Sequence, residues 1–224
     1  MSASLNRQGL REQLREHLAR RILDGTYPPG TRITETELMN EFRVSQAPIR
    51  EALRELEAMR FLESRLHHGV RVRSVSREEL VEMYPVRAAL EEVAGRLAGA
   101  KVTRQFLAGL DHEIAAMKAA ARRGDVHDEN LHDYQFHELI FEHSGNSLLL
   151  SIWRSMHFEM RALVTYLYLP LELKAIAEDH MPIYSALRSG DAKLAGQAMR
   201  EHVEKWGEQV TLHPERNLEA ADER

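Results

Sequence analysis

The feature that most constrains the fold is a pair of short amphipathic segments within residues 34–58, separated by only three residues. The first begins at TETE, typical of a capping box with Thr34 as the N-cap residue and Glu37 three positions later, and ends near Phe42. The second follows RVS, where Ser45 is the expected N-cap residue. Its inward apolar residues recur at helical spacing, at Ile49, Leu53 and Leu56. Two short helices joined in this way predict a helix-turn-helix.

Both flanks of this pair support a winged helix. Before it, an apolar residue recurs at every fourth position, at Leu10, Leu14, Leu18 and Ile22. This pattern predicts a helix that ends at Gly25. After it, FLESRL and VRVRSV read as strands, and the alternation in the second puts Arg71 and Arg73 on one face. The intervening HHG predicts a wing tip at His67, His68 and Gly69.

Charge separates this segment from the rest of the chain. Residues 1–75 contain thirteen arginines, no lysine and ten acidic residues, a net charge of +3. The remainder contains 17 basic and 25 acidic residues, a net charge of −8. This asymmetry favours a small domain that tolerates polyanions joined to a larger acidic one. There is no apolar run near the ~20 residues that a membrane span needs, so we expect no membrane contact.

From Ser76 onward the sequence predicts helices only. A second capping box, Ser76 with Glu79, opens a helix to about Leu97. Five further helical segments follow, at about 103–122, 128–143, 146–168, 171–188 and 191–212. The fold expected is therefore mostly α, with an N-terminal winged helix-turn-helix followed by an all-α antiparallel bundle. The domain boundaries expected are 1–75, 76–213 and a polar tail at 214–224.

Several polar residues fall on the apolar faces of these predicted helices. Asp133 and His137 share the side of their helix that also carries Ile140, whereas His132 and His143 fall to one flank. The apolar stripes of two later helices carry His180 and His202. A single such histidine is more often a hydrogen-bonded core residue. Together, three imidazoles and one carboxylate predict a shared divalent ion, zinc or nickel first, with iron or manganese as alternatives. With no cysteine in the chain, any metal site must use nitrogen and oxygen.

The N-terminal segment resembles the GntR family of bacterial transcription regulators over about residues 8–75. The motif VSQAPIREAL carries the resemblance, with PGTRITETEL upstream and HHGVRV downstream. It implies that Arg50 reads or braces DNA in the major groove and that Gly69 lets the wing enter the minor groove. The full set of DNA-contacting positions implied is Arg32, Thr36, Ser45, Gln46, Ala47, Pro48, Arg50, His68 and Gly69.

Three positions depart from the family pattern. Gln46 replaces the arginine that usually follows the serine, and Thr36 replaces an arginine that is common in the preceding helix. Arg60 replaces the glycine that normally precedes the wing. Glutamine pairs best with adenine and arginine with guanine, so the operator would differ from the family's commonest one. The alternative is that Gln46 contacts phosphate only.

The remainder resembles the FCD effector domain of the FadR subfamily, in its shorter, VanR-like six-helix branch, over about residues 78–212. DYQFH, SGN, EDH, SGD and AMREHV carry this resemblance. It implies that Asp133, His137, His180 and His202 are metal ligands, and it favours an organic acid as effector. Arg87, in a match to R-x-x-L-E, is the expected clamp for that acid, unless it simply pairs with Glu91 or another acid. Arg161 and Asn146 are further candidates, although Asn146 would also suit a helix cap.

These features predict a homodimeric regulator in the bacterial cytoplasm that binds a palindromic double-stranded operator and responds to a small carboxylate bound at the metal. Repression relieved by ligand is the expected outcome. The alternative is a metal sensor in which the ion itself is the signal. An enzyme is disfavoured because there is no H-E-x-x-H, and E-x-x-H occurs near the site only at Glu129–His132, whereas a di-iron bundle needs two.

Overall fold

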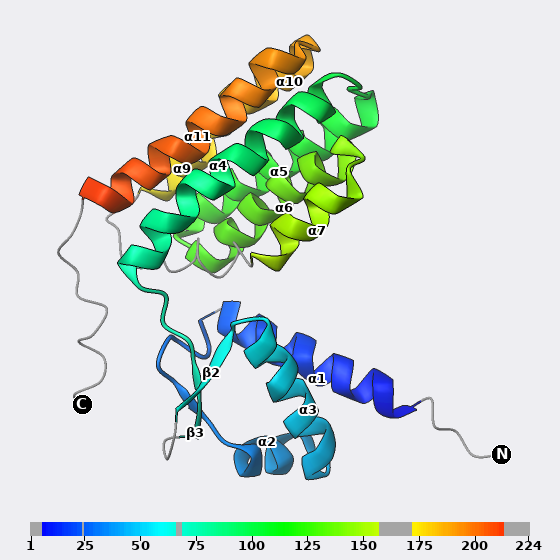
Figure 1. Cartoon of the computed structure of the whole chain (residues 1–224), viewed down its shortest axis with the longest axis vertical. Coiled ribbons are helices and arrows are strands. Elements are labelled where there is room, and N and C mark those ends of the chain that lie inside the picture. Colours follow the sequence, from blue (N-terminus) through cyan, green and yellow to red (C-terminus); the bar gives the residue numbers. More distant parts are fainter. Residues whose placement is uncertain (1–5, 24, 66–68, 157–171, 213–224) are drawn as a thin grey trace. The chain divides into compact units, whose positions relative to one another are not determined.

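The computed structural model describes four stretches of the chain: residues 6–23, 25–65, 69–156 and 172–212. The chain divides into two compact units, and the division falls between Ser74 and Val75 (Figure 1). No helix in these stretches combines the length and the apolar character that a membrane span requires.

In its described residues, the N-terminal unit consists of three helices and a small antiparallel sheet (Figure 1). Its elements are α1 (Asn6–Leu23), β1 (Arg32–Ile33), α2 (Glu35–Phe42), α3 (Gln46–Ala58), β2 (Leu62–Arg65) and β3 (Gly69–Val72). The strand order is β1-β3-β2, and the hairpin register runs from Leu62 opposite Val72 to Arg65 opposite Gly69. The predicted wing is confirmed. Strand β1 was not predicted, because two residues are too short to show an alternating pattern.

The core of this unit forms where the predicted apolar stripes meet. Helix α1 packs on α3, and the buried side chains include Leu14, Leu18, Ile22, Ile49, Leu53 and Leu56. Thr34 caps α2 as predicted, with its hydroxyl oxygen accepting from the Glu37 backbone N–H. The expected cap at Ser45 is only half right, because Ser45 holds the N-cap position of α3 but its side chain makes no capping hydrogen bond.

The backbone conformation of Arg60 explains why the related family carries glycine at this position. Arg60 has φ of 60°, in the left-handed region that glycine enters without steric cost. Its backbone N–H donates to Glu57, and the next residue, Phe61, is buried. A residue with a Cβ costs about 1 kcal/mol in this conformation, so the turn into β2 is retained with some strain.

The C-terminal unit is entirely helical in its described residues (Figure 1). Its helices are α4 (Arg77–Gly99), α5 (Arg104–Arg123), α6 (Val126–Ser144), α7 (Ser147–Ser155), α9 (Leu173–Asp179), α10 (Met181–Ser189) and α11 (Ala192–Leu212). The predicted capping box of Ser76 and Glu79 is confirmed, as is the Asn146 cap of α7. Helices α5 and α6, expected to end near residues 122 and 143, end just before Gly124 and Gly145, and both glycines have positive φ.

Two helix predictions need correction. The helix expected from Leu171 to Arg188 is two helices, α9 and α10, which join at His180. Pro182 in the first turn of α10 explains the break, because its ring has no N–H and would clash with a preceding carbonyl in a continuous helix. Helix α7 ends at Ser155, well before the expected Tyr168, and residues 157–171 lie outside the described stretches. The described part of the unit therefore holds seven helices, not six.

Helices α4 and α11 run side by side and pack closely (Figure 1). Glycines make this approach possible. A Cβ on Gly95 of α4 would lie 2.7 Å from both the Ala195 carbonyl oxygen and the Met199 Cγ atom of α11. On α11, a Cβ on Gly196 would lie 2.8 Å from the Glu92 carbonyl oxygen. The two helices therefore form a tightly fitted pair that carries His202 on one member and Glu91 on the other.

Candidate metal centre and DNA-reading surface

Three elements bring the four predicted metal ligands together inside the C-terminal unit. Helix α6 supplies Asp133 and His137, one turn apart, the α9–α10 junction supplies His180, and α11 supplies His202. All four side chains are buried, and each offers one ligand atom within 4.8 Å of the others. This juxtaposition agrees with the facing of each helix that the sequence predicted.

The ring nitrogens in this cluster are not satisfied by the protein alone. The Nε2 atoms of His137 and His180 are buried and have no hydrogen-bond partner. His180 Nε2 faces Asp133 Oδ1 at 3.0 Å without hydrogen-bond geometry. The ring centres of His180 and His202 are 4.6 Å apart. Buried acceptors that converge without donors are costly, and a shared cation removes that cost, so this donor set fits a divalent ion.

Each histidine is oriented through its other ring nitrogen. His137 Nδ1 contacts Glu91 Oε2 at 2.9 Å, His180 Nδ1 contacts the Ile176 carbonyl at 3.0 Å, and His202 Nδ1 contacts Asp179 Oδ2 at 2.9 Å. An acceptor at Nδ1 places the proton there and leaves Nε2 as the lone-pair donor. The three acceptors therefore set the tautomer that a metal site needs.

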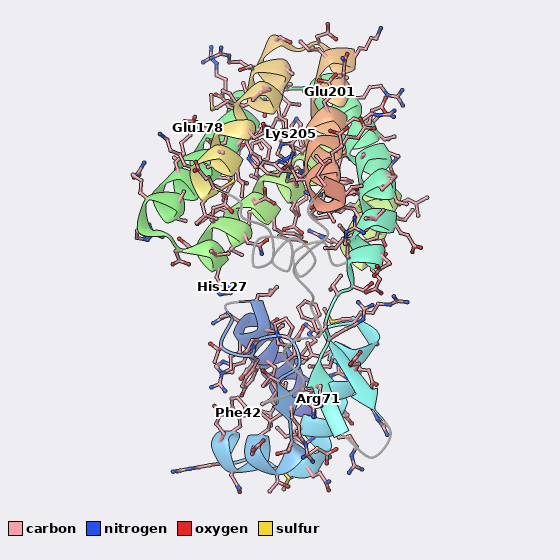
Figure 2. All side chains as sticks on the ribbon, turned by 90° about the vertical axis from the view of Figure 1, so that its left-hand side faces the viewer. Phe42, Arg71, His127, Glu178, Glu201 and Lys205 are labelled. Atoms are coloured by element: carbon pink, nitrogen blue, oxygen red, sulfur yellow. The ribbon has the colours of Figure 1, made fainter. Side chains whose placement is uncertain are left out.

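Glu91 and Asp179 support two of the predicted ligands, a role that the sequence did not predict for either residue. Glu91 is fully buried, and its Oε1 atom also accepts from Arg87 Nε at 3.1 Å and Trp153 Nε1 at 3.2 Å. Asp179 also accepts from Trp206 Nε1 at 3.1 Å and from Lys205 Nζ, which projects from α11 (Figure 2). Asp179 adjoins His180 in the motif EDH, which is a sequence signal for its role, whereas the sequence indicates Glu91 only as a partner for Arg87.

The protonation states in the cluster suit metal binding. Burial lowers the pKa of His202 to about 4, helped by the neighbouring imidazole of His180 and opposed by the hydrogen bond to Asp179, so the imidazole of His202 is neutral at pH 7. Burial alone would raise the pKa of Asp133, but its contact with His180, the nearby imidazole of His137 and the charge of Arg87 outweigh that effect and lower the pKa. A neutral imidazole and an ionised carboxylate are the forms that bind metals.

The three predicted effector residues lie in different settings. Arg87 is buried beside the cluster and forms an ion pair with Glu91, the alternative role left open by the sequence. Opposite charge on Glu91 and Asp133 raises the pKa of Arg87 against the effect of burial. Asn146 is exposed, and its Oδ1 atom accepts from the Leu149 N–H as a helix cap. Arg161 lies outside the described residues.

The predicted DNA-contacting residues gather at the start of α3 and at the wing. Ser45, Gln46, Ala47 and Arg50 are exposed, Pro48 is partly buried, and Thr36 is exposed on α2. Arg32 on β1 lies next to Gly69 on β3, since a Cβ on Gly69 would be 3.7 Å from Arg32 Nε. Gly69 has φ of 78°, which explains the glycine. His68 lies outside the described residues.

A winged helix joined to a helical unit with a buried cluster of potential metal ligands is typical of a regulator that binds DNA. Two family models match the chain: the bacterial regulatory proteins of the gntR family over residues 10–72, and the FCD domain over residues 82–205. The chain belongs to the GntR family and has the FCD domain of its FadR-like subfamily. It is therefore a DNA-binding transcription regulator, not an enzyme.

Relatives and solved structures agree with this assignment. A protein of Paenarthrobacter nicotinovorans named "Probable D-xylose utilization operon transcriptional repressor" is 34% identical over 220 residues, covering 98% of this chain and 96% of that protein. The gluconate operon transcriptional repressor of Bacillus licheniformis is 27% identical and covers 84% of this chain and 79% of its own. Escherichia coli McbR/YncC shares the fold, with a TM-score of 0.76 at 23% identity over 95% of this chain and 99% of that one.

Proposed function

We propose that this regulator is a homodimeric repressor that binds a palindromic operator and is released by a small organic acid bound at a metal ion in the C-terminal unit. The start of α3 would lie in the major groove, with Arg50 against a base or phosphate and the wing at Gly69 beside the minor groove. Two-fold symmetry of the dimer would be matched by two half-sites. Repression is supported by the names of two relatives, both of which are called repressors.

The observation that carries this proposal is the buried cluster of Asp133, His137, His180 and His202. We expect these four residues to hold zinc or nickel, with iron or manganese as alternatives. A bound divalent ion would supply a Lewis-acidic centre for a carboxylate. Arg87 lies beside the cluster and would add positive charge, and Arg161 and Asn146 remain candidates for further contacts. Gluconate, named in one relative's title, is itself a small carboxylate.

The test combines metal analysis with operator binding. Duplexes are first enriched from a randomised library by the full-length protein. Binding to the best duplex is then measured with metal-free protein, with metal-loaded protein, and with metal-loaded protein plus gluconate, other sugar acids or D-xylose. We expect a carboxylate to release DNA from the metal-loaded protein only. Release by D-xylose alone would contradict an acid effector.

A matched pair of histidine variants ties the response to the cluster. His180→Ala should bind less metal and lose the response to acid, whereas His112→Ala, at an exposed position on α5, should retain both. Full metal occupancy in His180→Ala would show that the ligand set is wrong. If metal alone releases DNA at physiological concentrations with no acid present, the protein is instead a metal sensor.

A further inference from the structure

A single carboxylate on α2 holds the two side chains of α3 that are best placed to read DNA. Gln46 and Arg50 are exposed and lie one helical turn apart. Arg50 donates through Nε to Glu35 Oε1 at 3.0 Å and through Nη2 to Glu35 Oε2 at 3.2 Å. Gln46 Nε2 donates to the same Oε2 atom. The three side chains therefore form a clamp, here called the Glu35 clamp, that links the two helices of the helix-turn-helix.

Glu35 is kept ionised and in place by its surroundings. It is the first residue of α2 after the Thr34 N-cap, where the helix dipole favours a negative charge. Hydrogen bonds from Arg50 and Gln46 lower its pKa, and the charge of Arg54 acts in the same direction. At neutral pH the carboxylate can therefore only accept hydrogen bonds.

This acceptor fixes which way the amide of Gln46 points. The amide carries an oxygen acceptor on one side and a donating NH2 group on the other, and a free glutamine can present either side. Only the NH2 group can bind a carboxylate, so Nε2 faces Glu35 and Oε1 points away from it. One hydrogen of Nε2 remains available beside Oε1. On Arg50, Glu35 engages Nε and Nη2, and Nη1 is left to face other partners.

We propose that Glu35 is a specificity-determining residue that acts through Gln46 and Arg50 without touching a base itself. The oriented amide presents an acceptor next to a donor, which matches the N6 amino group and N7 atom of adenine in the major groove. The inference rests on the proposed docking of α3 in that groove. The orientation by Glu35 accounts for a glutamine at position 46. Without a neighbouring carboxylate the amide could present either side to a base, and with it the amide selects adenine.

The clamp has opposite consequences for affinity and for discrimination. A negative charge on the DNA-facing side of α2 opposes phosphate contacts at every sequence and weakens binding in general. Orientation of Gln46 favours one base pair. Replacing Glu35 should therefore strengthen binding to arbitrary DNA and weaken selection at one position, a combination that a purely structural role would not produce.

The test uses the full-length protein and the best duplex enriched from a randomised library, with each base pair of a half-site changed in turn. Gln46→Ala identifies the position that Gln46 reads. At that position Glu35→Gln should lose about tenfold of discrimination, the range of one bidentate base contact. Glu35→Asp keeps the charge but shortens the side chain by one methylene group. It should lose discrimination between base pairs at that position without gaining affinity for arbitrary DNA. Glu51→Gln, at an exposed position of α3, removes the same charge and should keep discrimination.

Two results would overturn the inference. The first is that Glu35→Gln and Glu35→Asp both keep the ratio of affinities at the base pair read by Gln46 within about twofold of the unmodified protein. A bidentate base contact is worth far more than that. The other is Gln46→Ala leaving discrimination unchanged at every position. Either result leaves the proposed function standing as long as Arg50→Ala still loses operator binding. Thermal unfolding of each variant establishes that the domain is folded.

Discussion

At the scale of single residues, the candidate metal centre consists of the acceptors behind the three histidines as well as the four predicted ligands. His137 and His202 each rest on a carboxylate, and His180 rests on a backbone carbonyl. A carboxylate makes the imidazole a stronger electron donor than a carbonyl does. Asp179 is the more informative of the two carboxylates to change, because Glu91 also neutralises the buried charge of Arg87.

Asp179→Asn should lower metal affinity by about tenfold to a hundredfold without unfolding the protein, the usual effect of losing such a partner. An asparagine can still accept from His202 but carries no charge. The measurement is competition with a chromogenic chelator. Glu178→Gln is the control, since Glu178 lies next to Asp179 on α9 with a side chain that is 57% exposed (Figure 2). Equal affinities in the two variants would contradict the role of Asp179.

Arg50→Ala should abolish or severely weaken operator binding and leave metal content unchanged. The loss combines a base or phosphate contact with the release of Glu35, whose negative charge would then face DNA uncompensated. Arg20→Ala removes the same charge from an exposed position of α1 and should have a much smaller effect. Fluorescence anisotropy with the enriched duplex measures both. Normal affinity in Arg50→Ala would rule out the docking of α3.

At the scale of helices, the fit between α4 and α11 fixes how the acceptor Glu91 and the ligand His202 are spaced. Gly95→Ala places a methyl group 2.7 Å from both a backbone oxygen and Met199 Cγ, so the helices must separate. Overpacking costs about 1–3 kcal/mol, against about 1 kcal/mol gained in helix propensity. We expect a net loss of stability and weaker metal binding.

Gly109→Ala on α5 is the matched control for that substitution. Its Cβ would meet only Leu139 Cδ1 at 3.4 Å, so the helix-propensity gain should dominate and stability should be equal or higher. Urea unfolding followed by tryptophan fluorescence reports on the C-terminal unit, because both tryptophans, Trp153 and Trp206, lie in that unit. A Gly95→Ala variant as stable as Gly109→Ala would show that the α4–α11 contact is compliant.

The sequence predicted what depends on local spacing and missed what depends on tertiary contact. Helical periodicity put Asp133 and His137 on one inward face, and capping residues marked most helix ends. The break at His180 also has a local cause, because Pro182 lies in the first turn of α10 and cannot continue the preceding helix. The Glu35 clamp joins residues eleven and fifteen positions apart across a turn, and the pairing of β1 with β3 spans about forty. Neither leaves a periodic trace in the sequence.

At the scale of the whole molecule, the chain combines a basic DNA-binding unit with an acidic helical unit that carries the candidate metal centre. A ligand at the C-terminal cluster can change operator affinity only if it binds one state of the protein more tightly than another. This thermodynamic requirement holds for any structural mechanism that couples the two units. The coupling free energy is a property of the whole chain and can be measured from either end.

Linkage therefore supplies a quantitative prediction. If an acid lowers operator affinity by a given factor, operator DNA must lower acid affinity by the same factor, which for typical regulators is about 5-fold to 150-fold. Calorimetric titration of acid into metal-loaded protein, alone and saturated with the enriched duplex, measures one side, and anisotropy with and without acid measures the other. Unequal factors would mean that the acid acts at a second site or changes the oligomeric state. His180→Ala should abolish the effect of acid on operator affinity, because without the metal the acid no longer distinguishes the two states.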